Sequence, residues 1–214
     1  MLGTVARRRE FDGEVALDRA MAAFWARGYD ATSIDDLVAR MGIQRGSLYA
    51  AFGDKQALFL AALDRYDRVV VRELFEALEG PGSGVEAIRR FFRLRIERSL
   101  EPRRPLGCLM TNSAVELSGR NPGASAKIGT SLAKLERAFL RALARARDAG
   151  EIDATRDPRA VARFLTSSAQ GLSVIAKVAP ERAVLEDIVA VILSVLERGR
   201  PTAPRRRRRH PAAH

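Results

Sequence analysis

A short segment of the chain, QRGSLYAAFGDK at residues 44–55, places polar side chains beside unusually small ones at helical spacing. On a helix with 3.6 residues per turn, Leu48 and Phe52 share one side, and Gly46 and Ala50 face away from it. Small residues on an exposed face let a helix approach another surface closely, as it must to enter the major groove of DNA, which is roughly 12 Å wide. The segment therefore predicts a recognition helix anchored by its two apolar residues.

The polar residues in and around this segment are of types that form hydrogen bonds with nucleic acid. At the N-terminal end of the helix, Gln44, Arg45 and Ser47 are expected to reach base edges, and Ala50 is placed to contact a thymine methyl group. Hydroxyl groups, helix N-termini and ammonium groups commonly contact phosphates. The candidates of this kind are Thr32, Ser33, Tyr49 and Lys55. Each of the four also has a structural interpretation, as a helix cap, a packed ring or a solvated cation.

Helical periodicity predicts the elements that must position these residues. Apolar side chains at spacings of three and four predict a first helix over 13–27 that ends at Gly28. Two hydroxyl residues, each followed three positions later by an aspartate, predict the start of a second helix, which ends at Met41. Gly42 then allows a left-handed turn into the helix that begins near Gln44. Two short helices joined by a tight glycine turn form a helix-turn-helix.

The rest of the sequence also shows helical periodicity and no convincing alternation of period two, which predicts an all-α fold. A long helix over 55–79 is expected to link the N-terminal unit to a larger bundle, and the last helix is apolar on most sides. The further helices are expected at about 88–96, 106–117, 128–146, 157–178 and 181–198. We therefore expect about nine helices, arranged as a helix-turn-helix domain over 10–55, a larger helical domain over 56–199, and a disordered basic tail over 200–214.

The net charge of +11 lies mainly near the C-terminus. Residues 1–55 carry eight basic and eight acidic residues, whereas residues 198–214 carry seven arginines and no acid. The tract Arg205–Arg209 is interpreted as a tail that solubilises the protein or attracts DNA without sequence preference. Specific binding must then depend on the fit of the recognition helix and on a few placed donors, with help from dimerisation.

Several classes of chemistry lack their usual residues. The single cysteine, Cys108, excludes an internal disulfide and a multi-cysteine zinc site, and both histidines, His210 and His214, lie in the extreme tail. Because the folded part offers no Ser-His-Asp arrangement, GxGxxG or P-loop, we expect no enzyme activity, cofactor or metal. No signal peptide or long apolar run is evident, which predicts a soluble, cytoplasmic protein.

The run GYDATSIDDLVARMGIQRGSLYAAFGDKQALF, at residues 28–59, resembles the DNA-binding signature of the TetR (tetracycline-repressor) family. The family pattern is approximately G(Y/F)xxTSxxxIAxxxGVSxGSLYxHFxSKExLF, and its glycines, threonine, GSLY, phenylalanine and lysine coincide in register. Two residues depart from it, since Ala51 replaces a frequent histidine or aromatic residue and Gln44 replaces the usual serine. The resemblance implies a homodimeric transcriptional regulator, usually a repressor, that dimerises through its last two helices. It also implies release from the operator when a small molecule binds the C-terminal domain.

The C-terminal helices carry the residues that could bind such a molecule. For each candidate the ordinary interpretation is core packing, because aromatic residues at helical spacing usually pack against one another. The candidates are Phe92, Ile96, Met110, Asn112, Glu116, Phe139, Phe164, Ser168 and Gln170, together with Cys108.

Cys108 has two interpretations. It lies near Arg103 and Arg104 and close to a predicted helix start, and both features lower a thiol pKa, which favours reaction with electrophiles or oxidants. Free cysteine is also among the most buried residue types, so Cys108 could be a small core residue. Its surroundings, GCLMTN followed by Ala114 and Glu116, resemble a GCxxxNxAxE stretch of one TetR subgroup.

Two other classes of protein are alternatives to a ligand-responsive repressor. A helical small-molecule-binding protein without DNA function would share the C-terminal bundle, but the segment 44–55 argues against it. An enzyme would need a catalytic constellation, and the sequence offers none. The expected partners are therefore double-stranded operator DNA, a small-molecule inducer and a second copy of the chain, and no membrane.

Overall fold

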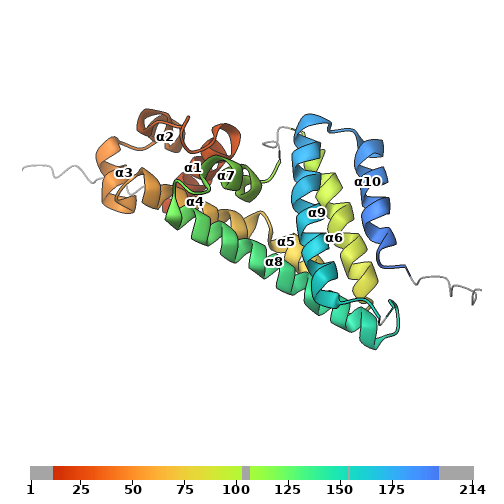
Figure 1. Cartoon of the computed structure of the whole chain (residues 1–214). Coiled ribbons are helices and arrows are strands. Elements are labelled where there is room, and N and C mark those ends of the chain that lie inside the picture. Colours follow the sequence, from red (N-terminus) through yellow and green to blue (C-terminus); the bar gives the residue numbers. More distant parts are fainter. Residues whose placement is uncertain (1–11, 103–106, 154, 198–214) are drawn as a thin grey trace, which may run out of the picture.

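The computed structural model describes residues 12–102, 107–153 and 155–197, which form ten α-helices and no β-strand. The predicted all-α fold is confirmed. Figure 1 shows α1, α2 and α3 towards one end of an elongated molecule and α6, α9 and α10 towards the other, with the long α8 running between the two ends. The helices are α1 (Gly13–Arg27), α2 (Ile34–Met41), α3 (Arg45–Phe52), α4 (Lys55–Val69), α5 (Arg72–Glu79), α6 (Gly84–Ser99), α7 (Leu109–Leu117), α8 (Pro122–Asp148), α9 (Pro158–Val178) and α10 (Arg182–Ser194).

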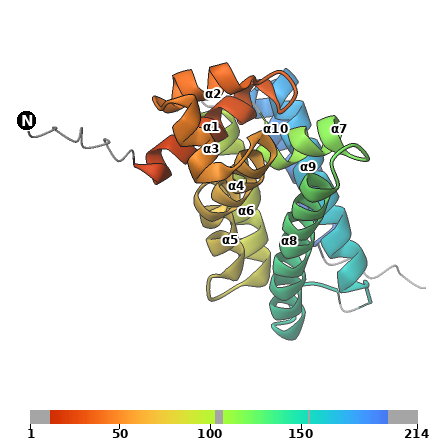
Figure 2. The ribbon, with the colours of Figure 1, turned by 90° about the vertical axis from the view of Figure 1, so that its left-hand side faces the viewer.

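The three N-terminal helices form where the sequence predicts them, because each has its own start and stop signals. Gly28, with a φ of 86°, ends α1, and Gly42 ends α2 in the left-handed conformation, with a φ of 71°. Ser33 and Asp36 form a capping box at the start of α2. Figure 2, turned by 90°, shows these helices gathered at one end of the molecule, beyond α5 and α6. The predicted helix-turn-helix is therefore present.

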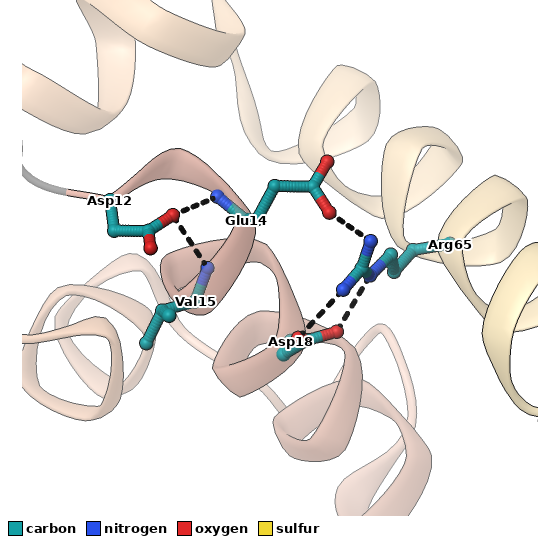
Figure 3. A network of polar contacts seen from close by, with 5 residues as sticks. All are labelled: Asp12, Glu14, Val15, Asp18 and Arg65. Carbon is teal, nitrogen blue, oxygen red and sulfur yellow. Dashed lines mark hydrogen bonds and ion pairs between the residues drawn. The ribbon is translucent and has the colours of Figure 1, made fainter.

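Arg65 of α4 fixes the position of α1 (Figure 3). Its Nε and Nη2 atoms donate to the two carboxylate oxygens of Asp18 at 2.8 and 2.9 Å, and its Nη1 donates to Glu14. Paired bonds of this kind add geometric specificity to the attraction. Asp12 caps α1 by accepting from the amides of Glu14 and Val15 at 3.0 and 3.3 Å. The first helix of the N-terminal unit is thus tied to α4.

The long helix predicted over 55–79 is instead two helices, α4 and α5, which meet at Val70 and Val71. The Tyr66 carbonyl accepts from the Val70 amide at 2.9 Å and from the Val71 amide at 3.2 Å, which widens the turn. The Val70 carbonyl accepts from the Arg98 guanidinium of α6. A side chain that enters the backbone ladder in this way interrupts a helix. The prediction of one continuous helix was wrong, and the described residues form ten helices where about nine were expected.

Two hydrophobic cores are joined by α8. The first contains α1 to α4, α7 and the start of α8, and the second contains α5, α6, α9, α10 and the rest of α8. Lys127 and Ser131 of α8 bond to Asp64 and Asp67 of α4 at 2.6 and 2.8 Å. Because the first core extends well past residue 55, the predicted domain limits remain predictions.

The remaining helices confirm the predicted periodicity but differ at their ends. Within the described residues, α7 begins at Leu109, α8 begins at Pro122 after the capping residue Asn121, and α10 ends at Ser194. The predicted tail and its arginine tract lie outside the described residues, as do Arg103 and Arg104. No helix in the described part of the chain is long and apolar enough to cross a membrane.

Candidate nucleic-acid interface and ligand cavity

The helix α3 has the exposed face of small residues that the sequence predicts. Leu48 is completely buried and Phe52 is half-buried, and both pack in the first core. Gly46 and Ala50 are exposed. A Cβ atom at Gly46 would meet nothing within 4 Å, so packing inside the chain does not require glycine at this position. The free space beside Gly46 therefore lies on the solvent-exposed side of α3.

The N-terminal end of α3 carries exposed donors. Gln44 is the N-cap of α3, and its side chain forms no capping hydrogen bond. The Arg45 guanidinium bonds to the Asp35 carboxylate of α2 at 2.6 Å, with 56% and 80% of the two side chains exposed. Because solvent screens such an exposed pair, it adds little to stability, and an acceptor on DNA can replace Asp35 at small cost. Ser47, the third predicted base contact, is half-buried.

The two hydroxyl groups at the start of α2 are used inside the protein. Thr32 is completely buried and donates to the Gly28 carbonyl at 2.6 Å, so its side chain does not face a phosphate, contrary to the sequence-based expectation. The Ser33 hydroxyl is exposed, but it accepts from the Asp36 amide at 3.0 Å and donates to the Asp36 carboxylate at 2.7 Å. Hydrogen bonds from the Ser33 hydroxyl and amide, with a contribution from Arg27, lower the pKa of Asp36 to about 2.

Tyr49 and Lys55, the other predicted phosphate contacts, differ in how far they are exposed. Tyr49 on α3 is 44% exposed. Lys55 at the start of α4 is half-buried, and its Nζ lies 4.4 Å from the centre of the Tyr29 ring. A cation over an aromatic face is held in place without losing its charge. The Lys55 ammonium is therefore positioned beside the loop that leads from α1 to α2.

The same loop is also held by α7 and by the segment that follows it. Glu116 accepts from the amides of Tyr29 and Asp30 at 3.0 and 2.7 Å, and Arg120 pairs with Asp30 at 3.1 Å. A Cβ atom at Gly28 would lie 2.7 Å from a Glu116 carboxylate oxygen. Glu116 was expected to bind a ligand, but in the structure its carboxylate joins the C-terminal part of the chain to the helix-turn-helix.

Two small cavities, each of about 30 Å³, are both lined by Tyr66, Val71, Leu74 and Arg95. The first has an apolar wall that includes Phe91 and Leu135, and polar groups from Tyr66, Cys108 and Gln170. The second is lined by Trp25 of α1, by residues around the break between α4 and α5, by α6, and by Gly107 and Ser173. The cavities thus lie where α1, α4 and the bundle meet.

Cys108 is buried at the N-cap of α7 and accepts from the Tyr66 hydroxyl at 3.4 Å. Burial raises the pKa of the Cys108 thiol, but the Arg95 charge and hydrogen bonds from Tyr66 and Thr111 outweigh burial and lower that pKa below its ordinary value. The pKa of Cys108 is therefore lowered, as the sequence predicts. The described cation that lowers it is Arg95, and the two arginines named from the sequence lie outside the described residues.

Three of the residues predicted to bind ligand, Cys108, Met110 and Gln170, line the first cavity. Phe92 and Phe139 are completely buried in the second core and line neither cavity. These two aromatic residues contact each other through stacked rings 6.0 Å apart, so their role in the structure is packing.

The other predicted residues line neither of these two cavities. Ile96 lies in a surface groove between α6 and α10, and Asn112 lies with Glu116 in a groove between α1, α7 and α9. Phe164 is 44% exposed on α9, and Ser168 is half-buried on the same helix. The ligand role predicted for Phe164 and Ser168 has no support in the two cavities, because neither residue lines them.

Arg95 and Tyr66 line both cavities and were not predicted. The signal in the sequence was a cation at helical spacing in an apolar stripe, because Arg95 follows Ile88, Phe91 and Phe92 on one side of α6. Tyr66 lies within the helix predicted over 55–79, and no separate signal marked it.

Comparison with known families agrees with this arrangement. A family model described as "Bacterial regulatory proteins, tetR family" matches residues 16–62, and one described as "Tetracyclin repressor-like, C-terminal domain" matches residues 84–192, about half of the chain. The chain belongs to the TetR family. It is therefore a helix-turn-helix transcriptional regulator.

Individual relatives extend over nearly the whole of this TetR-family regulator. The uncharacterized HTH-type transcriptional regulator YezE of Bacillus subtilis is 39% identical over 90% of this chain and 100% of its own. The HTH-type transcriptional repressor ComR of Escherichia coli is 33% identical over 86% of this chain and 87% of its own. Among solved structures, a cysteine mutant of the TetR family regulator CifR, complexed with 26-base-pair operator DNA, is 34% identical with a TM-score of 0.80 and covers 89% of this chain and 100% of its own.

This TetR-family chain also has an exposed apolar face on its last two helices. Figure 1 shows α9 and α10 beside each other at the end of the molecule away from α3. Gly171, in the middle of this face of α9, has open space where a Cβ would lie. The exposed apolar residues are Phe164, Val174, Ile175 and Val178 on α9, and Val184 and Val191 on α10. A face of this kind marks a protein interface.

Proposed function

We propose that this regulator is a repressor that binds a two-half-site operator as a homodimer and leaves it when a small molecule or an electrophile acts on its C-terminal part. The observation that carries the proposal is the exposed face of α3. Gly46 on this face has free space where a Cβ atom would lie, and packing inside the chain does not require glycine there. The CifR complex with operator DNA supports double-stranded DNA as the partner. Such a repressor acts where the chromosome lies, in the cytoplasm, and its function requires no catalysis.

The structure supports a division of labour among the predicted DNA contacts. Gln44, Arg45 and Ser47 lie at the end of α3 that enters the groove first, with Ala50 exposed one turn later. Arg45 exchanges Asp35 for an acceptor on a base edge. We assign base contacts to these four residues.

The phosphate contacts are assigned to exposed or charged groups around α3. Tyr49 is exposed, and Lys55 carries an ammonium group held over the Tyr29 ring. Ser33 and the amides at the start of α2 are weaker candidates, because the first turn of α2 also carries Asp35 and Asp36. Two carboxylates in the first turn oppose the attraction of the helix N-terminus for an anion. Tyr49 and Lys55 therefore contribute more to phosphate binding than α2 does.

A second copy of this chain is the proposed occupant of the apolar face on α9 and α10. Operator half-sites lie about one helical turn apart, roughly 34–36 Å, so a dimer with two-fold symmetry is needed to place two copies of α3 in successive grooves. Small residues at the middle of the α9 face, including Gly171, allow two helices to pack closely.

The helix α7 offers a route from the cavity to the helix-turn-helix. Its N-cap, Cys108, lines the first cavity, and Glu116, in its last turn, holds the Tyr29–Asp30 loop. A ligand that moves α7 would weaken the hydrogen bonds between Glu116 and the Tyr29–Asp30 loop and so alter the position of α2 and α3. The ligand must bind the form released from DNA more tightly, and a tenfold preference corresponds to about 1.4 kcal/mol.

An electrophile would act through Cys108. Addition of the thiolate to the β-carbon of an α,β-unsaturated carbonyl compound forms a C–S bond, and the α-carbon takes a proton from water. The lowered pKa of Cys108 favours the thiolate. Release of DNA by such compounds is expected to be lost in Cys108→Ser, and unchanged release would leave Cys108 as a core residue.

The proposal is tested with two glycine variants. Genomic fragments that bind the full-length protein are first selected, and the affinities of Gly46→Ala and Gly129→Ala are then measured on the selected sites. Gly129 on α8 is the matched control, because a Cβ there also meets nothing within 4 Å. Both changes should preserve the fold, since alanine favours a helix by up to about 1 kcal/mol.

The expected result is a roughly tenfold loss of affinity, about 1.4 kcal/mol, for Gly46→Ala and no loss for Gly129→Ala. Equal affinities of both variants and the wild type would show that α3 does not approach the duplex closely. Failure of the wild-type protein to select any fragment would support the alternative of a ligand-binding protein without DNA function.

A further inference from the structure

Arg95 of α6 is a buried cation. Only 8% of the residue is exposed, and its Nη2 donates to two neutral oxygens of α9, the Ala169 carbonyl at 3.1 Å and the Ser173 hydroxyl. No carboxylate in the described part of the chain pairs with it. By contrast, Arg98, one turn further along α6, pairs with Glu73. A buried charge normally requires a partner of opposite charge, because removal from water is costly.

The surroundings of Arg95 have the polarity of a binding site. The first cavity is lined by the apolar side chains of Phe91, Leu132 and Leu135 and also by Arg95 and Gln170. Both hydrogen bonds from Arg95 to α9 come from Nη2, so Nε and Nη1 are the groups available to a further acceptor. A small ligand with one anionic end and one apolar end would complete both parts of the site.

We propose that Arg95 binds the carboxylate of a small monocarboxylic acid, whose hydrocarbon part lies against the apolar wall. This inference rests on the ligand-responsive function proposed above and names the chemical class of the ligand. A single buried guanidinium matches a single negative charge, and its N–H groups fit carboxylate oxygens. The cavities, about 30 Å³ each, limit the ligand to a few heavy atoms and require some widening on binding.

The Cys108 thiolate is the other anion that could neutralise Arg95. A thiolate in this position would make a carboxylate unnecessary, whereas a neutral thiol would leave the cation without a partner. The two possibilities predict opposite results for Cys108→Ala. If the thiolate is the partner of Arg95, the acids bind Cys108→Ala and not the wild type. If a carboxylate is the partner, the acids already bind the wild type, and this binding depends on Arg95.

The site is placed to influence the DNA-binding unit. Val71, at the break between α4 and α5, lines both cavities, and Trp25 of α1 lines the second. Widening the cavity would therefore move the C-terminal end of α4 and the end of α1 that precedes the Tyr29–Asp30 loop. Ligand binding and the orientation of α3 are linked through these contacts.

The test is calorimetric titration of the full-length protein with acetate, propionate, butyrate and isobutyrate, each compared with its neutral amide. Sodium chloride at the same ionic strength controls for a general anion effect. The variant is Arg95→Met, and the matched control is Arg90→Met, which removes a half-buried arginine of the same helix that donates to the Ala77 carbonyl. Circular dichroism checks that each variant is folded.

We expect at least one acid to bind the wild type and Arg90→Met at least tenfold more tightly than its amide, and Arg95→Met to lose this preference. The inference is overturned if every acid and its amide bind equally, if chloride competes equally well, or if only Cys108→Ala binds the acids. The comparison of acid with amide uses the wild type, so it stands even if Arg95→Met does not fold. Operator binding measured without any acid separates this result from the proposed function, because a repressor that binds DNA but ignores all four acids refutes only the ligand class.

Discussion

Replacing Glu116 tests whether α7 supports the helix-turn-helix. The Glu116 carboxylate accepts two hydrogen bonds, from the amides of Tyr29 and Asp30 at 3.0 and 2.7 Å, and no other described side chain accepts from these amides. Glu116→Ala removes both bonds, whereas Glu116→Gln keeps one acceptor oxygen. The matched control is Glu79→Ala, which breaks an exposed ion pair with Arg141 at a distance from the loop.

The size of the effect follows from the kind of bond. A hydrogen bond to a charged group contributes about 1.5–3 kcal/mol when buried, and the half-exposed position of Glu116 places each bond at or below the lower end of that range. We therefore expect Glu116→Ala to lower the free energy of unfolding by about 2 kcal/mol and Glu116→Gln by about 1 kcal/mol. The control should cost less than about 1 kcal/mol, as exposed pairs do.

Urea unfolding gives the free energies, and amide hydrogen exchange locates the change. In Glu116→Ala, the amides of Tyr29 and Asp30 should exchange roughly 30-fold faster, which is the factor that 2 kcal/mol implies. The amides of α6 should be unaffected. Unchanged exchange at Tyr29 and Asp30 would refute the proposal that α7 holds this loop.

Three further outcomes are expected. Ser33→Ala should raise the pKa of Asp36 from about 2 towards its ordinary value in a carboxylate NMR titration, and an unshifted pKa would contradict the capping box. In the wild type the pKa of Asp36 is lower in the folded than in the unfolded state, so its contribution to stability is complete above about pH 4 and is lost as the pH falls towards 2. Ile175→Glu on the apolar face of α9 should convert a dimer into a monomer by light scattering, whereas Thr130→Glu on an exposed position of α8 should not, and a dimeric Ile175→Glu would exclude this face as the interface. Arg95→Met should raise the pKa of the Cys108 thiol, measured from the pH dependence of thiolate absorbance, and an unchanged pKa would show that Arg95 does not act on the thiol.

The N-terminal unit could be predicted from the sequence because its signals are local. Gly28, Gly42 and the Ser33–Asp36 capping box each end or begin a helix through contacts within four residues. The inward side of α3 followed from the spacing of Leu48 and Phe52 alone. Thr32 was assigned a phosphate contact because the sequence does not show that its hydroxyl turns back to Gly28.

The break between α4 and α5 could not be predicted, because it depends on a distant residue. The apolar periodicity reaches Val70 with no stop signal there, and the interruption requires Arg98 of α6 to bond to the Val70 carbonyl. Glu116 was similarly assigned to a ligand site, since only the folded structure brings α7 to the Tyr29–Asp30 loop. Arg95 had a local signal, a cation in an apolar stripe, but its missing carboxylate partner is a property of the folded structure.

The central claim is that α3 recognises an operator through a few placed donors. Footprinting of the purified protein on its own upstream DNA, at two salt concentrations, tests it directly, with Arg45→Ala and Tyr49→Phe measured on the protected site and on base-substituted versions of it. We predict a protected palindrome of two half-sites, a loss of base preference in Arg45→Ala, and a uniform loss of affinity across sequences in Tyr49→Phe. The absence of a protected palindrome in all upstream DNA tested, or an equal loss on all sequences for Arg45→Ala, would contradict the claim.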